Sequence, residues 1–204
     1  IEYWSEKRGK PSIAELFRKG KQGEDPVMTY RQQYQLTQEQ FNDEMIDCYQ
    51  HLVNLDFSHA YQETRPYACQ FLTKMEKTEK EGWLRPVNDV IPEDYGFNAI
   101  RLSLPSRSKK VSAQVQPLVQ PNTDGLRYGF VAVTTDDESV YGKPVSHGKA
   151  QLKLPRKPLK ALYLVVMGAP AVHQIISRTP NSINKQYPYQ IKLSDTMICL
   201  DVMV

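Results

Sequence analysis

The run Ala161-Leu162-Tyr163-Leu164-Val165-Val166-Met167 decides the fold of this chain. It is apolar at nearly every position, whereas a strand with one solvated face alternates apolar and polar residues. The run is also far too short to cross a membrane, which takes about 20 residues. We therefore expect an inner β-strand that is covered on both faces.

Segments on both sides of this run alternate apolar and polar residues with a period of two, which is typical of half-buried strands. Ile100 and Leu102 alternate with Arg101 and Ser103, and Asp136-Asp137-Glu138 separates two further runs in the manner of a hairpin. The other predicted strands are 111–115, 128–135, 139–141, 150–154, 189–193 and 198–204. Short strands without helical periods between them predict an antiparallel β-sandwich over residues 96–204, jelly-roll or Ig-like in type.

Two short helices are predicted near the start of the chain. Ser12 with Glu15 three residues later has the pattern of a capping box for a helix over 13–19. Asp25 followed by Pro26 predicts an N-cap and a first-turn proline for a second helix, which ends near residue 34.

A longer helix is predicted to begin at Thr37, which forms a second capping-box pattern with Gln40. Its apolar stripe comprises Phe41, Met45, Cys48, Leu52 and Val53. A fourth helix over 58–80, kinked at Pro66, and a loop over 83–95 complete the pattern. We therefore assign residues 1–95 to a helical region, and the fold class is α+β.

Composition and charge narrow the class of protein. The 204 residues are 40% hydrophobic and 24% charged, which is ordinary for a globular chain. The net charge is only +3, and the basic residues form separate clusters instead of one stripe, so we expect no nucleic-acid partner. We expect no membrane span, and because the chain begins at Ile1 instead of Met, we expect a processed chain or a piece of a longer protein.

The three cysteines have neither metal-like spacing nor an even count. We interpret Cys48, Cys69 and Cys199 as small buried hydrophobic residues, and we expect no cofactor.

Stretches between about residue 29 and residue 193 carry a resemblance to known proteins. They are LTQEQFNDE at 36–44, YGFNAI at 95–100, YGFVAV at 128–133, LVVMGAP at 164–170 with His173, and YPYQIK at 187–192. As a set they resemble a domain family of unknown function from large secreted bacterial proteins. This chain departs from the family pattern, which prefers Trp near Leu126 and at Tyr187, and Asp-Gly where the chain has Asp137-Glu138.

The resemblance implies an extracellular or cell-surface setting. It also implies that the chain matches the C-terminal part of the family, downstream of a region that looks like a zinc metallopeptidase. It supplies no catalytic residues.

The sequence contains no His-Glu-x-x-His run, which a zinc hydrolase of that type requires. Asp43, Asp47 and His51 follow one another at one-turn intervals and could hold a metal on one helix face. However, Asp43 and Asp47 each lie roughly 200° around the helix from Phe41 and Met45, respectively. We therefore prefer a solvated helix face and expect no metal site.

Other titratable residues have ordinary structural explanations. His59 and Glu63 are one turn apart and could form an acid/base pair, but surface positions near a helix start explain them. His147 lies in a turn-like stretch and is expected at the surface. Residues 136–138 could offer oxygen ligands to calcium, but a polar hairpin tip is the simpler explanation.

The candidate binding residues are one histidine and a set of tyrosines. His173 follows Gly168-Ala169-Pro170 at the end of the most buried predicted strand, a place where loops carry sites. Tyrosines offer an apolar face and a hydroxyl to sugar rings or protein loops, and packing across strands is the competing interpretation. The predicted binding set is Tyr128, Tyr141, His173, Tyr187 and Tyr189.

These patterns favour a non-catalytic binding or interaction module of a larger exported bacterial protein, with a glycan or protein ligand. The alternative is the C-terminal part of a zinc-metallopeptidase-like enzyme whose catalytic domain lies outside this chain. A third hypothesis is a structural spacer. We expect the helices to cover one sheet and to leave the outer face of the other sheet free for binding.

Overall fold

The computed structural model describes residues 1–58, 61–118, 125–175 and 185–203. Its central strand β8, Leu159–Ala169, contains the apolar run that predicts the fold. β8 pairs with β3 on one side and β5 on the other, and the side chains from Ala161 to Met167 are at most 3% exposed. The prediction of an inner strand covered on both faces is confirmed.

The first sheet is antiparallel and has the strand order β3-β8-β5-β6. β5 and β6 form the predicted hairpin, in which Asp137 adopts a left-handed φ of 69°. The Thr134 hydroxyl stabilises this turn because it donates to the Asp136 carboxylate and accepts from the Glu138 amide. The remaining bounds are β3 Phe97–Arg101, β5 Gly125–Thr134 and β6 Ser139–Tyr141.

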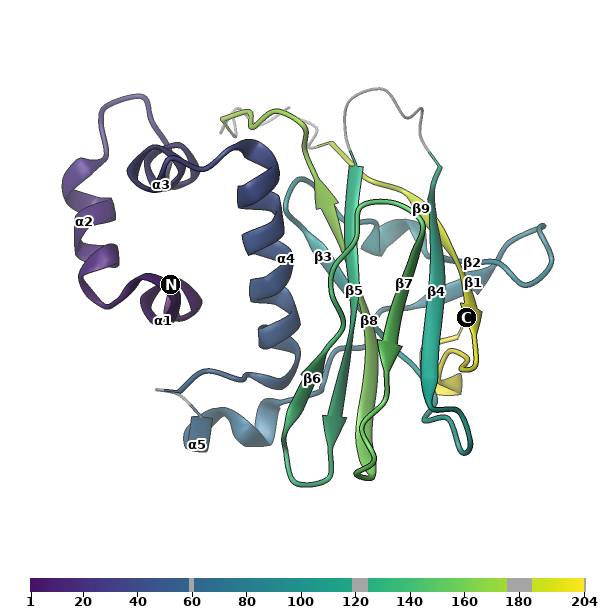
Figure 1. Cartoon of the computed structure of the whole chain (residues 1–204). Helices are drawn as coiled ribbons and strands as arrows, with labels where there is room; N and C mark the ends of the chain where they lie inside the picture. Colours follow the sequence, from purple (N-terminus) through teal and green to yellow (C-terminus); the bar gives the residue numbers. More distant parts are fainter. Residues whose placement is uncertain (59–60, 119–124, 176–184, 204) are drawn as a thin grey trace.

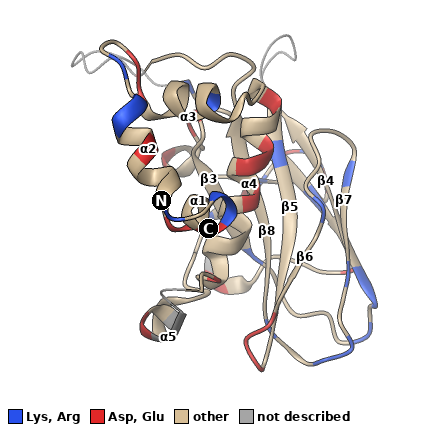
Figure 2. Cartoon of the chain, turned by 60° about the vertical axis from the view of Figure 1, so that its left-hand side comes forward, with Lys and Arg blue, Asp and Glu red and all other residues tan. Residues whose placement is uncertain are grey.

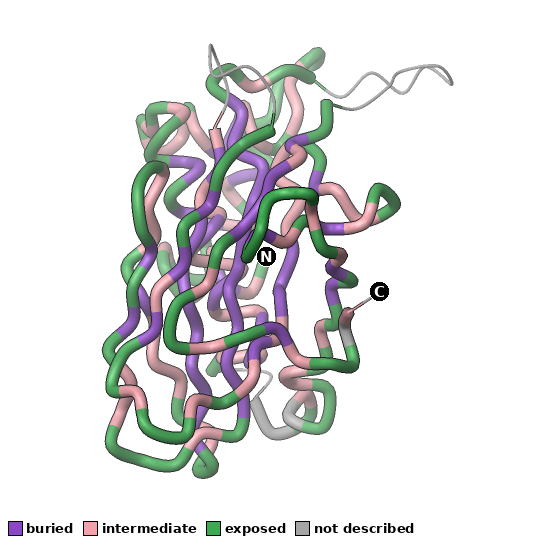
Figure 3. The backbone as a smooth tube through the Cα atoms, turned by 90° about the vertical axis from the view of Figure 1, so that its right-hand side faces the viewer, coloured by how far each residue is buried: buried purple, intermediate pink, exposed green. Residues whose placement is uncertain are grey.

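The second sheet is also antiparallel, with the order β1-β2-β9-β4-β7. Buried and exposed residues alternate along β4 and β7, so one face of this sheet packs inward and the other meets solvent (Figure 3). Its strands are β1 Met75–Lys77, β2 Leu84–Pro86, β4 Lys110–Pro117, β7 Lys149–Lys153 and β9 Tyr189–Ser194.

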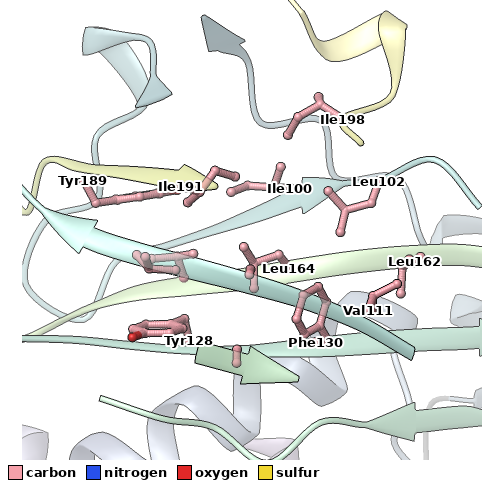
Figure 4. Close-up of a cluster of buried hydrophobic side chains, with 14 of the residues drawn as sticks. Ile100, Leu102, Val111, Tyr128, Phe130, Leu162, Leu164, Tyr189, Ile191 and Ile198 are labelled. Atoms are coloured by element: carbon pink, nitrogen blue, oxygen red, sulfur yellow. The ribbon is translucent and has the colours of Figure 1, made fainter. Parts of the chain in front are cut away.

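The two sheets face each other across a shared hydrophobic core (Figure 4). Leu164 of β8 belongs to the same buried cluster as Val111 of β4 and Ile191 of β9. Tyr163 and Val165, the neighbours of Leu164 on β8, belong instead to a second cluster under helix α4. Successive β8 residues thus stabilise two different layers, at roughly 1.5–3 kcal/mol for each large apolar side chain.

The helices lie on the first sheet in two layers (Figure 1). α4 contacts β5, β6 and β8, and α1, α2 and α3 lie on the far side of α4. Asp25 caps α3 by accepting from the Met28 amide, and Thr37 forms the predicted capping box with Gln40. The bounds are α1 Glu2–Arg8, α2 Pro11–Lys19, α3 Pro26–Tyr34 and α4 Gln38–Asn54.

The start of the chain differs from the prediction. Helix α1 was not expected, and α2 begins at Pro11, so Ser12 lies inside the first turn of α2. The Ser12 hydroxyl caps nothing, and it is buried without a partner among the described residues. The predicted Ser12–Glu15 capping box is therefore wrong, because Pro11 starts this helix.

Helix α4 turns a different face to the sheet from the predicted one. The sheet side is a row at four-residue spacing, Asn42, Ile46, Gln50 and Asn54, and each member is at most 2% exposed. Phe41 and Met45 of the predicted stripe instead pack with residues of α2 and α3, although Met45 also reaches the cluster under α4. Val53, the last residue of the predicted stripe, is buried in the cluster under α4, so the stripe is divided between the other helices and the sheet.

The amides of this row hydrogen-bond to backbone groups at three levels of the sheet. Asn42 Nδ2 donates to Pro170 O at 2.9 Å. Gln50 Nε2 donates to both Phe130 O and Gly142 O, each at 2.9 Å. Asn54 Nδ2 donates to Asp137 O at 3.1 Å and to the Ser139 hydroxyl at 2.8 Å. These bonds give the buried amide donors of α4 their acceptors on the sheet and on the segments beside it.

The predicted fourth helix over 58–80 is wrong. The chain forms a short helix α5, Tyr61–Thr64, followed by the 3-10 turn η1, Arg65–Tyr67, because Pro66 cannot continue an α-helix. Met75 of its predicted stripe is a fully buried residue of β1. The predicted loop over 83–95 contains β2 and the 3-10 turn η2, Asn88–Val90. Strands of the second sheet therefore lie inside the segment that we assigned to the helical region.

The predicted strand over 198–204 is also wrong where the structure describes it. This segment contains the 3-10 turn η3, Leu200–Val202, and makes single bridges from Ile198 to Leu102 and from Met203 to Met75. Val204 lies outside the described residues.

The three cysteines are partly buried. No disulfide joins Cys48, Cys69 and Cys199, and burial raises the pKa of the Cys48 thiol to about 11. Across the described ranges, no helix has both the length and the apolar character required to cross a bilayer.

Candidate functional site

Polar side chains surround the end of β8, beside a tight turn at Tyr95. A Cβ added to Gly168 would lie only 2.5 Å from Glu93 O, so β8 and the turn touch where only glycine fits. Tyr95 N donates to Gly168 O, and Gly168 N donates to Gly96 O, both at 3.0 Å. Tyr95 has a φ of 57°, which is uncommon for a residue with a side chain. Because strained residues cluster at functional sites, we take this turn as a candidate.

His173 is the centre of a hydrogen-bonded chain at this turn. Its Nε2 is 2.6 Å from Asp25 Oδ2 at the start of α3, and its Nδ1 is 3.0 Å from the Tyr95 hydroxyl. The Tyr95 hydroxyl also accepts from Gln38 Nε2 at 3.0 Å. A neutral imidazole with its proton on Nε2 satisfies the whole chain, because Tyr95 then donates to Nδ1 and Nε2 donates to Asp25.

The burial of its side chains limits the chemistry that the His173 cluster can perform. The His173 side chain is 4% exposed. Burial also raises the pKa of the Tyr95 hydroxyl, with a partly opposing effect from the Gln38 hydrogen bond. The hydroxyl is therefore protonated at neutral pH, and its hydrogen bonds to His173 and Gln38 hold it within the cluster. The cluster anchors the segment after β8 to α3 and α4.

His173→Ala should lower the free energy of unfolding by about 2 kcal/mol, because it leaves Asp25 and Tyr95 without their shared partner. The measurement is urea unfolding followed by circular dichroism. His147→Ala is the matched control, since His147 is exposed as predicted and should tolerate the change. Equal stability of the two variants would contradict the anchoring role.

The carboxylates on the outer side of α4 are engaged by protein groups. Asp43 Oδ1 pairs with Arg127 Nε of β5 at 2.7 Å (Figure 2). Asp47 accepts from the Tyr3 hydroxyl and pairs with Lys7 of α1 at 3.4 Å. Among the described residues, no group of three His, Cys, Asp or Glu side chains has the geometry of a metal site. These carboxylates join α4 to its neighbours.

His51, the third member of the predicted constellation, packs on Tyr141. Their rings stack with centroids 4.4 Å apart, and the Tyr141 hydroxyl donates to Asp56 Oδ2 at 2.6 Å. Burial and this hydrogen bond raise the pKa of Tyr141, so it acts as a neutral donor. Tyr141 thus links β6 to the segment after α4.

The remaining acidic candidates have basic partners or exposed positions. Lys157 Nζ lies 2.8 Å from the Asp136 carboxylate and 2.6 Å from that of Glu138, while Lys160 pairs with Asp137. The hairpin carboxylates therefore already have cationic partners. Glu63 is exposed, and His59 lies outside the described residues.

The predicted tyrosines do not form a solvent-facing patch. Tyr128, Tyr187 and Tyr189 are at most 2% exposed and belong to the core between the sheets. Their hydroxyls bond to Gly148 O, to the Asp94 carboxylate and to Asn98 Nδ2, respectively. These contacts correspond to the competing interpretation, packing across strands.

An open groove of about 390 Å³ lies among α1, α2 and the start of α3. Its apolar wall consists of Ile1, Trp4, Ile13, Leu16 and Phe17. Phe17 is 78% exposed at this groove. Trp4 stacks on Tyr30 with centroids 4.2 Å apart, and its buried Nε1 has no partner among the described residues. Glu24 and Asp25 are the titratable side chains in the wall.

A family comparison covers this whole architecture. Residues 1–199 match a family described as "Family of unknown function (DUF6055)". The chain belongs to this family. No curated protein matches the chain. The DUF6055 match spans the helices and both sheets, and it confirms the prediction of a domain family of unknown function.

The groove of this DUF6055 domain was not predicted from the sequence, because α1 was not expected. The usable signal was Ile13, Leu16 and Phe17, which recur at the spacing of one helix face. A short helix with such a face needs a partner, and α1 covers only part of it.

Proposed function

We propose that this DUF6055 domain is a non-catalytic binding module that holds a polypeptide segment in the groove of α1–α3. The observation that carries the proposal is the exposed Phe17 at an apolar groove. Apolar surface gathered in a groove marks binding sites on soluble proteins. In contrast, the candidate binding residue His173 and the possible metal ligands Asp47 and His51 are engaged in internal contacts.

The chemistry of the groove favours an apolar segment that carries a basic residue. Glu24 and Asp25 place negative charge in the wall, and Lys or Arg complements it. A glycan is less well supported, because the tyrosines that favoured it are buried.

The resemblance to a family from large secreted bacterial proteins supports a wider setting for this domain. We place the domain in a larger exported or cell-surface bacterial protein, downstream of a zinc-metallopeptidase-like region. The two facing sheets support a β-sandwich of jelly-roll or Ig-like type. In the alternative, an enzyme whose catalytic domain lies outside this chain, the groove would contact that domain.

A displayed peptide library tests the proposal. The chain should select peptides with apolar residues flanked by Lys or Arg, and Phe17→Ser should weaken their binding about 30-fold, as loss of a central aromatic contact does. Leu200→Ser is the control, because Leu200 is 87% exposed and belongs to η3, which lies near β1 and away from α1, α2 and α3 (Figure 1).

Two outcomes would contradict the proposal. One is a library that selects no peptides while a glycan array gives specific binding. The other is a set of selected peptides whose affinity is the same for the parent chain and Phe17→Ser.

A further inference from the structure

The outer face of the second sheet is a separate surface with its own chemistry. β4, β7 and β9 contain no Asp or Glu, and the side chains that they turn to solvent are lysine, glutamine and serine. These solvent-facing side chains include Lys110, Gln114, Lys149, Gln151, Lys153 and Lys192. The basic residues come from segments far apart in the sequence, so the sheet gathers what looks scattered in the chain.

The strand register places like charges together on this face. Lys110 lies directly opposite Lys153, and Gln114 lies between Lys149 and Lys192. Like charges directly opposite each other destabilise a sheet. All four lysines are exposed, and none takes part in an ion pair among the described residues. A bound anionic group would relieve this repulsion.

The same face continues into an open cavity beside β2 and β9. The cavity has a volume of about 420 Å³, and its wall includes Lys77, Lys80, Arg85 and Gln190. Glu79 also lines it, and Arg85 Nε pairs with Glu76 Oε1 at 2.6 Å, so the excess positive charge comes from Lys77 and Lys80. Gln190 connects the cavity to the open face, because its Nε2 donates to Gln116 Oε1 on β4 at 2.9 Å. Positive charge therefore extends across the sheet.

We propose that this face binds an acidic polysaccharide, a chain of sugars with carboxylates on its units. The ammonium groups supply attraction, and the amides of Gln114 and Gln151 both donate to and accept from sugar hydroxyls. Lys149 and Lys153 are separated by about 13 Å along β7, and Lys149 and Lys192 by about 10 Å across the sheet. This spacing suits a polymer whose charges are well separated.

Nucleic acid fits this face less well. A duplex carries one charge per about 1.7 Å, far denser than the lysines. Single strands are held by stacking on aromatic side chains, but β4 and β7 have none and Tyr189 of β9 is buried.

Polygalacturonate is a suitable probe for the intact chain, with binding measured by biolayer interferometry at low and at near-physiological ionic strength. Lys149→Gln combined with Lys153→Gln should weaken binding about tenfold or more, and added salt should weaken it further. Lys10→Gln combined with Lys21→Gln removes the same charge from exposed positions on the helical side and should have little effect. Methyl-esterified polygalacturonate should not bind.

Several outcomes would overturn the proposal. One is that polygalacturonate does not bind at low ionic strength. Another is that the two double variants weaken polygalacturonate binding equally. The third is that the methyl-esterified polymer binds as tightly as polygalacturonate. A DNA oligonucleotide that binds as tightly and depends on Lys149 and Lys153 would assign the face to nucleic acid instead. Phe17→Ser should leave polygalacturonate binding unchanged, which separates this face from the groove.

Discussion

Gly168→Ala should lower the free energy of unfolding by about 3 kcal/mol or more. The new Cβ would lie 2.5 Å from Glu93 O and 2.6 Å from Cδ2 of Tyr187. Neither atom can move freely, since Glu93 O accepts from Gly96 N at 2.8 Å and Tyr187 is in the core. The backbone contact between β8 and the Tyr95 turn must therefore open.

Urea unfolding of Gly168→Ala and Gly125→Ala measures this effect. Gly125 lies opposite Ala169 in the same sheet, and a Cβ there meets only the end of the Arg127 side chain at 3.9 Å. This control should stay within about 0.5 kcal/mol of the parent. If both variants were equally stable, the close approach at Gly168 would be contradicted.

Gln50→Glu should cost about 3–5 kcal/mol at neutral pH although the two side chains have nearly the same shape. Gln50 is 1% exposed, and its Nε2 donates to two carbonyl oxygens. An ionised carboxylate would face those two acceptors with no proton to share. Burial raises the pKa of such a carboxyl, so the deficit should shrink as the pH falls toward about 4, where the unfolded chain also binds the proton.

The control for this change is Gln22→Glu, which introduces the same charge at an exposed residue between α2 and α3. Thermal or urea unfolding at several pH values compares the two variants. A Gln50→Glu protein as stable as Gln22→Glu at neutral pH would show that α4 does not lie on β5 and β6 as described.

Local patterns predicted the strands well because each strand carries its own signal. The apolar run of β8 indicates a strand that is buried on both faces. The period-two segments of β4 and β7 indicate strands with one buried and one solvent-exposed face. β1 was missed because its three residues are too few to show a period, whereas the equally short β6 was predicted from the hairpin turn before it. The position of β1 depends on its pairing with β2, and the position of β2 depends on its pairing with β9.

The face of α4 could not be predicted from hydropathy. Its sheet side contains Asn42, Gln50 and Asn54, which a hydropathy pattern assigns to solvent. These amides can be buried because their N–H groups donate to carbonyls of distant segments, and a sequence does not show which carbonyls those are.

The candidate site was predictable only in part. His173 was identified from its position after the buried strand, but its partners Asp25 and Tyr95 come from far earlier in the chain. Tyr128 and Tyr189 were assigned to a surface because aromatic residues in strands suit a surface or a core equally, and only the three-dimensional packing decides.

The position of β9 has a consequence for the order of events during synthesis. Once the ribosome has released Ala169, every strand of the first sheet is available, but the second sheet still lacks the strand between β2 and β4. Until residues 189–194 emerge, both neighbours present unpaired strand edges, which are templates for aggregation. A nascent chain that pauses in this interval should need protection by a chaperone, and one released after Ser194 should not.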